Sequence, residues 1–145
     1  MTKYKFRVPI PPKLEELKSL VEKEAEKIVQ KTSGKAFKKM IIDDSDRRAV
    51  YSVKVIFYLG EHRWKKEFNR PIPREDWGLD LDNLIKQVFD GLGPIIGYRK
   101  NWSNKKEHAG AWDSAIVEVY AKKEKTEGPE YVEIEVEKLY DAVRR

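Results

Sequence analysis

The sequence predicts a single α+β domain: a mixed four-stranded sheet, elements in the order β-α-β-α-β-β, and helices packed on the sheet. Three observations lead to this prediction. The chain has 145 residues, the size of one domain that can bury an ordinary core. Four segments carry the residue pattern of strands, and two longer segments carry apolar residues at helical spacing. No internal repeat divides the chain.

The first strand and the first helix are predicted near the N-terminus. Tyr4, Phe6 and Val8 alternate with basic residues, which is the period of a half-buried strand. Prolines at 9, 11 and 12 end this strand, because proline cannot donate to a sheet ladder. An amphipathic helix of about 17 residues follows from Leu14, and Ser33-Gly34 ends it.

The middle of the chain predicts a buried strand and the clearest helix. Residues 50–59 are rich in β-branched and aromatic side chains, which favours a mostly buried strand. Apolar residues from Leu81 to Leu92 then recur at i, i+3, i+4, i+7, i+8 and i+11, and residues 91–94 end the helix. Long loops are expected on both sides of this helix, over 60–78 and 93–111.

Two more strands are predicted in the C-terminal part. They cover residues 115–122 and 131–137, and a turn at 126–129 joins them. The pattern after Lys138 is compatible with a short terminal helix.

Composition excludes several kinds of site. The chain has no cysteine and 2 histidines, so disulfides, thiolate zinc sites and a three-histidine metal site are ruled out within one chain. A metal would therefore need oxygen ligands. The net charge of +5 permits an anionic partner without proving one. No stretch has the ~18 apolar residues of a membrane span, and the N-terminus lacks a signal-peptide core, so we expect a cytoplasmic protein without a membrane partner.

Acidic residues open the second helix in the sequence Asp80-Leu81-Asp82-Asn83. One reading is capping, since an aspartate at a helix start accepts backbone N–H groups and favours the helix dipole. Two acids and an amide exceed what a cap needs. The other reading is a Mg²⁺ site, completed by Asp113, which lies just before a predicted strand.

Electrostatics bears on this choice. At about 4 Å and an effective dielectric near 20, two like charges cost roughly 4 kcal/mol, so three converging carboxylates need a cation. Lys86 lies four residues after Asp82 on the same helical face. It could form a surface ion pair of about 0.3–0.5 kcal/mol, or contact a phosphate beside the metal.

These motifs resemble the RusA-type Holliday-junction resolvases. The segment from Asp80 through Lys86 to Asp90 is similar to the signature helix of that family, and residues 112–117, Trp-Asp-Ser-Ala-Ile-Val, resemble its second motif. The resemblance implies a homodimeric endonuclease, dependent on magnesium or manganese, that cuts four-way DNA junctions. It implies that Asp80, Asp82 and Asp113 bind the metal and that Lys86 assists catalysis.

The two long loops combine aromatic and basic residues. All four tryptophans, Trp64, Trp77, Trp102 and Trp112, lie in or beside them, together with cations such as Arg63. This combination suits nucleic acid, because cations neutralise phosphates and rings stack on unpaired bases. Alternatively, the cations are a solvated surface and the tryptophans, Trp112 above all, anchor the loops. The candidate DNA contacts are Arg70, Arg74, Arg99, Lys100, Lys105 and Lys106.

The sequence therefore favours a magnesium-dependent endonuclease acting on branched DNA in recombination and repair, with the metal polarising the scissile phosphate and activating water. Two alternatives stay open. The first is a DNA-junction-binding protein of the same fold that has lost catalysis. The second is a metal-dependent phosphoesterase acting on small nucleotides.

Overall fold

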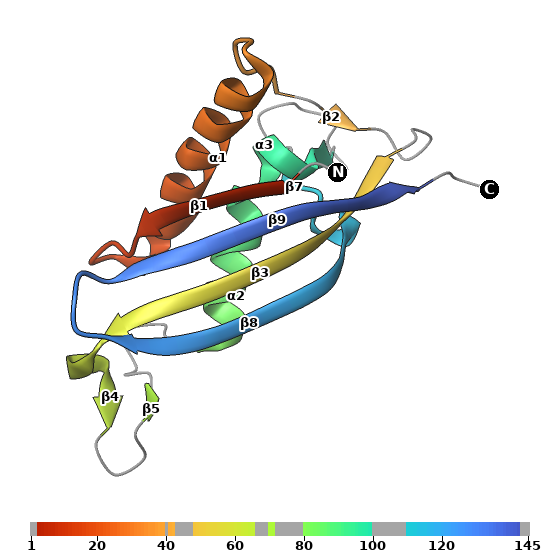
Figure 1. Ribbon diagram of the computed structural model, residues 1–145. Coiled ribbons are helices and arrows are strands. Elements are labelled where there is room, and N and C mark those ends of the chain that lie inside the picture. The colour runs from red at the N-terminus through yellow and green to blue at the C-terminus, as the bar shows by residue number, and fades with distance from the viewer. Residues whose placement is uncertain are drawn as a thin grey trace.

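The main sheet of the computed structural model has four strands and confirms the predicted α+β class. The structure describes residues 3–39, 41–42, 48–65, 70–71, 80–99 and 110–142. Along the sheet the order is β1, β9, β3, β8, which are Lys3–Pro9, Tyr131–Ala142, Arg48–Gly60 and Ile116–Thr126 (Figure 1). Strand β9 is antiparallel to β1 and β3, whereas β8 is parallel to β3, so the sheet is mixed.

Strand β3 is the centre of the core. Alternate residues Val53, Val55, Phe57 and Leu59 are fully buried on one face of the sheet, as the period of a strand requires. Both neighbours align with β3 in register, so that, for example, Val55 lies between Ile134 of β9 and a residue of β8. On the other face Ile56 is buried, Tyr58 is half-buried and Lys54 is exposed, so the strand is continuously buried only on the face that carries Val53, Val55, Phe57 and Leu59.

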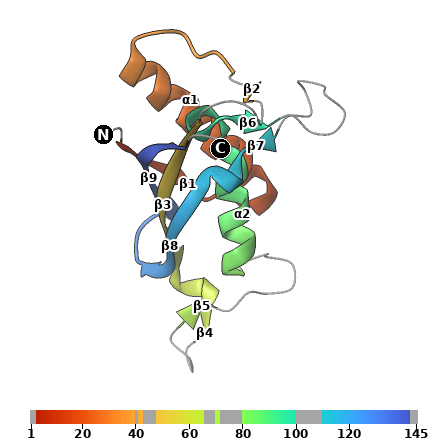
Figure 2. The ribbon, with the colours of Figure 1, turned by 90° about the vertical axis from the view of Figure 1, so that its right-hand side faces the viewer.

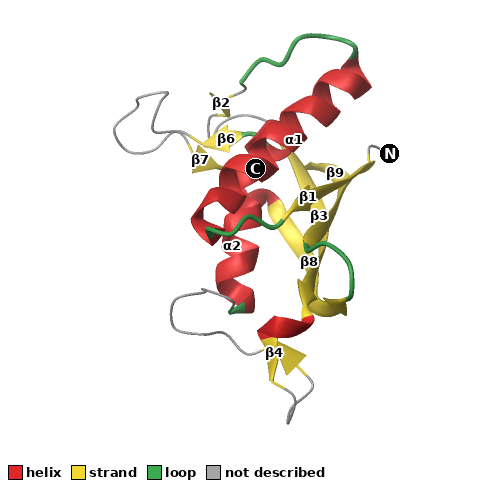
Figure 3. Cartoon of the chain, turned by 90° about the vertical axis from the view of Figure 1, so that its left-hand side faces the viewer, coloured by secondary structure: helices red, strands yellow, loops and turns green. Residues whose placement is uncertain are grey.

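The helices cover the face of the sheet that carries these buried residues (Figure 3). A 3-10 turn, η1 (Leu14–Glu16), leads into α1 (Leu17–Ser33), which ends at Gly34 with a φ of 70°. Helix α2 (Leu81–Gly91) packs against α1, and the one-turn helix α3 (Gly93–Ile96) follows it directly. A Cβ atom at Gly91 would lie 2.7 Å from the carbonyl oxygen of Lys18, so a glycine is needed where α2 meets α1.

Several short elements lie at the two ends of the main sheet. At the end of β3 are the 3-10 turn η2 (Glu61–Arg63) and the antiparallel pair of β4 (Trp64–Lys65) and β5 (Arg70–Pro71). Around the beginning of β8 are η4 (Asp113–Ala115) and a small sheet in the order β2, β6, β7, which are Ile41–Ile42, Tyr98–Arg99 and Gly110–Ala111. The stretch predicted as a loop over 93–111 therefore contains regular structure, including α3.

The C-terminal part confirms the predicted turn but not the terminal helix. The segment after Lys138 is not helical: β9 continues to Ala142, because its last residues pair with β3 from Arg48 to Val50. Residues 127–130 do join β8 to β9, but the two strands are not neighbours, since β3 lies between them. The connection thus passes across the end of β3 instead of forming a hairpin.

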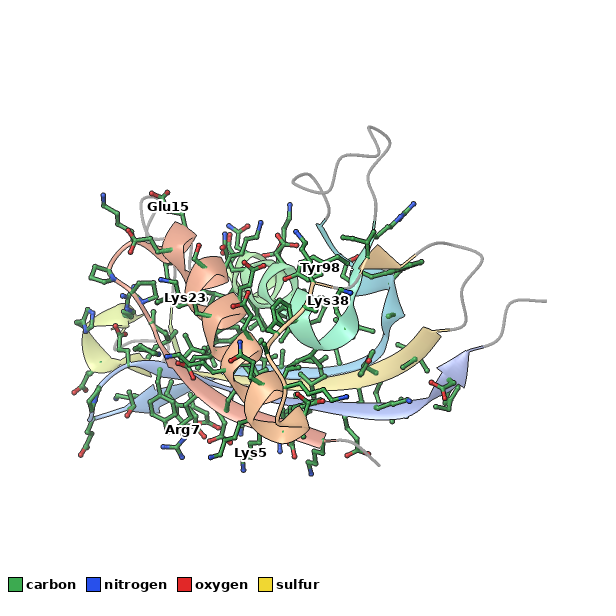
Figure 4. All side chains as sticks on the ribbon, turned by 90° about the horizontal axis from the view of Figure 1, so that it is seen from above. Lys5, Arg7, Glu15, Lys23, Lys38 and Tyr98 are labelled. Atoms are coloured by element: carbon green, nitrogen blue, oxygen red, sulfur yellow. The ribbon has the colours of Figure 1, made fainter. Side chains whose placement is uncertain are left out.

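The other face of the sheet carries charged side chains instead of helices. Figure 4 shows Lys5 and Arg7 on the side away from α1. Lys3 pairs with Glu135, and the Arg7 guanidinium lies 3.4 Å from Glu133, so that basic β1 and acidic β9 neutralise each other. This alternation is typical of a solvated sheet face. In the part of the chain that the structure describes, no helix is both long enough and apolar enough to span a membrane.

Candidate metal and nucleic-acid site

Asp80 and Asp82 lie at the beginning of α2, and both are exposed. The backbone of Asp80 starts the helix, because its carbonyl oxygen accepts the N–H of Leu84 at 3.0 Å. Its carboxylate makes no capping hydrogen bond in the described structure. The carboxylate of Asp82 accepts the adjacent N–H of Asn83 at 3.0 Å and no other hydrogen bond from the described residues. The backbone geometry is therefore that of a helix cap, while the carboxylate of Asp80 is not used for capping and both carboxylates are accessible to a ligand.

The charges of the same two carboxylates act on Lys123 of β8. It lies beside Phe57 of β3, on the face of the sheet that the helices cover, and α2 contacts β8 (Figure 1). Burial lowers the pKa of the Lys123 ammonium, although the negative charges of Asp80 and Asp82 act to raise it. A half-buried cation thus lies within electrostatic reach of both acids.

Sequence reasoning missed Lys123. The signal was present in the alternation of β8, because Lys123 is two residues after Ala121 and so belongs to the face where an apolar residue is expected. A half-buried ammonium is disfavoured unless negative charge lies nearby, and Asp80 and Asp82 supply that charge.

Lys86 lies on the exposed side of α2, one helical turn beyond Asp82. Within the described residues, these two side chains do not approach closely enough to count as an ion pair. The surface ion pair considered from the sequence is therefore not formed in this structure, and the Lys86 ammonium is available to a phosphate near Asp82.

Within one chain, Asp113 lies far from Asp80 and Asp82. It lies in η4, beside α3, where the backbone N–H of Trp112 donates to the carbonyl oxygen of Gly97 at 2.9 Å. Strand β8 advances about 3.3 Å per residue, so Ile116 and Lys123 are separated by about 23 Å along it. Among the described residues, no group of three or more acidic or histidine side chains could hold a metal ion.

The reason for this separation is the direction of β8. The strand runs opposite to α2, so the residues before β8 lie near the end of α2 while Asp80 and Asp82 lie at its beginning (Figures 1 and 2). The expected convergence of three carboxylates in a single chain is therefore not found. The pair of Asp80 and Asp82 still fits Mg²⁺, which is commonly held by one or two carboxylates together with waters and substrate phosphates.

The predicted DNA-contact residues also lie at two different ends of the molecule. The backbone of Arg70, in β5, lies at the end of the molecule where α2 begins, and β5 contacts β8 (Figure 2). Arg99, in β6, is exposed at the opposite end, opposite Gly110 of β7. The remaining candidates lie outside the described residues: Arg74, Lys100, Lys105 and Lys106.

Two other loop residues have structural roles. Trp112 is 3% exposed, which supports the anchoring alternative and leaves no ring face for a base. The Arg63 guanidinium donates to the Glu130 carboxylate at 2.7 and 3.1 Å, so it is not a free phosphate contact. Burial would raise the pKa of Glu130, but the hydrogen bonds and charge of Arg63 and the Gly60 N–H outweigh it and lower the pKa.

Comparison with known proteins adds no relative: the chain matches no family model and no curated protein sequence.

Proposed function

We propose that this protein is a magnesium-dependent endonuclease that nicks branched DNA, with the four-way junction of recombination as its substrate. The observation that carries the proposal is the beginning of α2, where two exposed carboxylates lie within electrostatic reach of Lys123 and Lys86 lies one helical turn further along. The residue pattern around it, from Asp80 to Asp90, resembles the signature helix of the RusA-type resolvases. The cytoplasmic location expected from the sequence is part of this proposal.

Each residue of this site has a distinct task. Asp80 and Asp82 would hold the metal, which supplies positive charge at the scissile phosphate. Lys123, fixed on β8, would hold the carboxylates and the phosphate in one arrangement, because its position is set by the sheet. Lys86, exposed on the surface of α2, would contact a neighbouring phosphate.

A labelled four-way junction tests the proposal. Purified protein should nick it with Mg²⁺ and should not nick it with a chelator. Asp82→Asn should reduce nicking at least about 100-fold while junction binding is kept or tightened, because the carboxylate repels phosphates when no metal is bound. Asp90→Asn, on the same helix, changes the net charge equally and should nick as the wild type does. Equal nicking by Asp82→Asn would refute the assignment.

A second candidate is a junction-binding protein without catalysis, and the position of Asp113 favours it. A single chain holds two of the three expected carboxylates at α2. Under this alternative, the protein binds the junction equally well with and without Mg²⁺ and never cuts it. Its affinity would still fall steeply with salt, by about 10³-fold or more between 50 and 200 mM for six or more phosphate contacts.

A further inference from the structure

Positive charge is concentrated where α1 ends. From Leu17 to Gln30 the helix has three lysines and three glutamates, so its charge is balanced. From Lys31 to Lys39 the chain has four lysines and no acidic residue. Three aspartates and two arginines follow by residue 48, so residues 31–48 have six basic and three acidic residues and keep a net charge of +3. The chain thus changes from balanced to basic at the end of this helix.

Three of these lysines are accessible to an anion. Lys31, Lys35 and Lys38 are exposed, and within the described residues none of them forms an ion pair. Earlier on the same helix, by contrast, the Lys27 ammonium lies 3.3 Å from the Glu24 carboxylate. The lysines at the end of α1 therefore keep their full charge for a partner.

The backbone that carries these lysines is held at both of its ends. At the first end, Gly34 closes α1 with a φ of 70°, and the N–H of Lys35 donates to the Ser33 hydroxyl at 3.2 Å. At the second end, the Lys39 ammonium lies 4.5 Å from the centroid of the Tyr98 ring, a cation–π contact. A segment that is already positioned loses less conformational entropy when its side chains bind a partner.

Arg99 extends this basic surface. Strand β2 follows Lys39 and pairs parallel with β6, so that Ile42 lies beside Arg99, and the arginine is exposed. Figure 3 shows the chain leaving α1 and crossing to β2 and β6. Of the acidic residues on α1, Glu22 accepts the hydrogen bond of the Tyr98 hydroxyl at 3.0 Å and is therefore already used.

We propose that Lys31, Lys35, Lys38 and Arg99 form a second DNA surface, which binds phosphates of one junction arm about one helical turn from the branch point. The surface rests on the charge and exposure of these four residues, whereas the identity of its ligand rests on the proposed nuclease function. Several cations without acidic partners suit DNA, because each phosphate that they neutralise releases a counterion.

The place of this surface in the fold sets the distance along the DNA. The end of α1 and strand β2 lie at the end of the molecule opposite to the beginning of α2 (Figure 1). Strand β3 extends between these two ends, and its 13 residues span about 43 Å. One turn of duplex is about 34–36 Å long. An arm whose branch-point phosphate lies at Asp80 and Asp82 would therefore reach the second DNA surface about one turn away.

Contact at two separate positions has a consequence for the reaction. A single contact lets the arm rotate about it, whereas two contacts fix the direction of the arm. The second DNA surface would thus determine which phosphate faces the metal, although it lies far from the reacting atoms.

The salt dependence of junction binding tests the surface without reference to cleavage. Binding of a labelled four-way junction is measured with a chelator present, so that the DNA stays intact. Each phosphate contact contributes about 0.9 to the slope of log K against log salt. Lys35→Ala/Lys38→Ala should therefore reduce the slope by about 1.8 or more and lower the affinity near 100 mM salt by about 10- to 100-fold. Lys35→Arg/Lys38→Arg keeps both charges and should bind as the wild type does.

The matched control is Lys23→Ala/Lys27→Ala, which removes the same charge from the balanced part of α1, where both lysines are exposed. Its slope should differ from that of the wild type by less than about 0.5. Equal losses in the two alanine variants would overturn the proposal. So would unchanged binding by Lys35→Ala/Lys38→Ala, because the lysines would then serve a partner other than DNA.

An attached cleaving reagent tests where the surface lies on the DNA. The chain has no cysteine, so Ala36→Cys, exposed between Lys35 and Lys38, can carry the only iron–EDTA group. Glu15→Cys, exposed before the beginning of α1, is the control, and Figure 4 shows Glu15 and Lys38 toward opposite ends of this helix.

We expect the reagent at Ala36→Cys to cut one arm about 10 base pairs from the branch point, and the reagent at Glu15→Cys not to cut there. No cutting from Ala36→Cys, cutting at the branch point itself, or the same pattern from both variants would overturn the proposed position.

The second DNA surface and the nuclease function can fail separately. If the wild type binds the junction and Lys35→Ala/Lys38→Ala reduces the slope, but no junction is ever nicked, the nuclease function fails and the surface stands. If the wild type nicks the junction and the variant binds with an unchanged slope, the surface fails and the nuclease function stands. A wild type that binds no junction overturns both.

Discussion

The two ends of β8 are built differently. At its beginning, the Asp113 end, Trp112, Ile96 and Tyr98 are at most 4% exposed. At its far end, beside the first turn of α2, Asp80 and Asp82 are exposed and the cation of Lys123 is half-buried. The first end buries large apolar surface, while the second keeps charged groups at the surface. Asp113 is itself exposed, but it lies alone on a corner held by buried apolar residues, whereas two exposed carboxylates lie close together in sequence at the beginning of α2.

Tyrosine hydroxyls at the buried end support this comparison. The Tyr51 hydroxyl donates to the carbonyl oxygen of Ile95 in α3 at 3.2 Å, and burial raises its pKa to about 12. Burial also raises the pKa of Tyr98, whose hydroxyl donates to Glu22 of α1 at 3.0 Å, and the negative charge of Glu22 adds to the effect. The Tyr51 hydroxyl thus joins β3 to α3, and the Tyr98 hydroxyl joins β6 to α1.

Substitutions at the two ends of β8 should therefore change different properties: stability at the buried end and activity at the exposed end. The largest expected effect is the loss of stability at the buried end. Trp112→Ala should lower the free energy of unfolding by about 3–5 kcal/mol, because it leaves a large cavity. Asp82→Asn should change it by less than about 0.5 kcal/mol, since the side chain is exposed. Urea unfolding measures both. Similar losses for the two variants would contradict the distinction between a structural and a functional end.

The second largest effect on stability is expected for the ion pair that holds the exposed end together. The ion pair of Arg63 and Glu130 fixes the end of β3 to the beginning of β9. Glu130→Gln should cost about 1–3 kcal/mol at neutral pH, because the arginine loses a charged hydrogen-bond partner. Glu127→Gln, exposed in the same turn, should cost nearly nothing.

The pH dependence of this effect has a definite sign. The pKa of Glu130 is lowered in the folded protein, so its contribution to stability is present above the ordinary value of 4.5 and is lost as the pH falls through the lower folded value. Wild type and Glu130→Gln should therefore become more alike in urea unfolding as the solution is acidified below about pH 4.5. A difference that stays constant through this range would exclude the ion pair as the anchor.

The smallest effect on stability, and a clear one on activity, is expected for Lys123. Lys123→Met should keep or raise the free energy of unfolding, because burial already disfavours the charged ammonium. It should slow junction nicking by about 10- to 100-fold if the ammonium stabilises the negative charges of the carboxylates and the phosphate. Lys125→Met, two residues further along β8 and exposed, is the control and should nick normally. Equal rates for Lys123→Met and the wild type would remove Lys123 from the site.

Much of the fold follows from local pattern. The alternation in β1 and the helical spacing from Leu81 to Leu92 depend on near neighbours, and the helix of about 17 residues is found as α1 with 17 residues. The end of β9 could not be predicted in this way. Residues 138–142 are strand because β3 offers them partners some 90 residues earlier in the chain, and pairing of this kind leaves no local signal.

The site could be predicted only in part for the same reason. The pair of Asp80 and Asp82 is local, and its position at a helix start follows from the residues around it. The distance from this pair to Asp113 depends on the direction and neighbours of β8, and a sequence motif carries neither. Lys123 was missed because its significance depends on which face of β8 meets α2.

The central claim is that Asp80 and Asp82 bind a divalent metal ion, and Mn²⁺ binding followed by electron paramagnetic resonance tests it most directly. The wild type should bind Mn²⁺, more tightly with a four-way junction present, because substrate phosphates complete the coordination. The double variant Asp80→Asn/Asp82→Asn should lose this binding, while Asp90→Asn should retain it. A double variant that binds Mn²⁺ as tightly as the wild type, with or without the junction, would contradict the account.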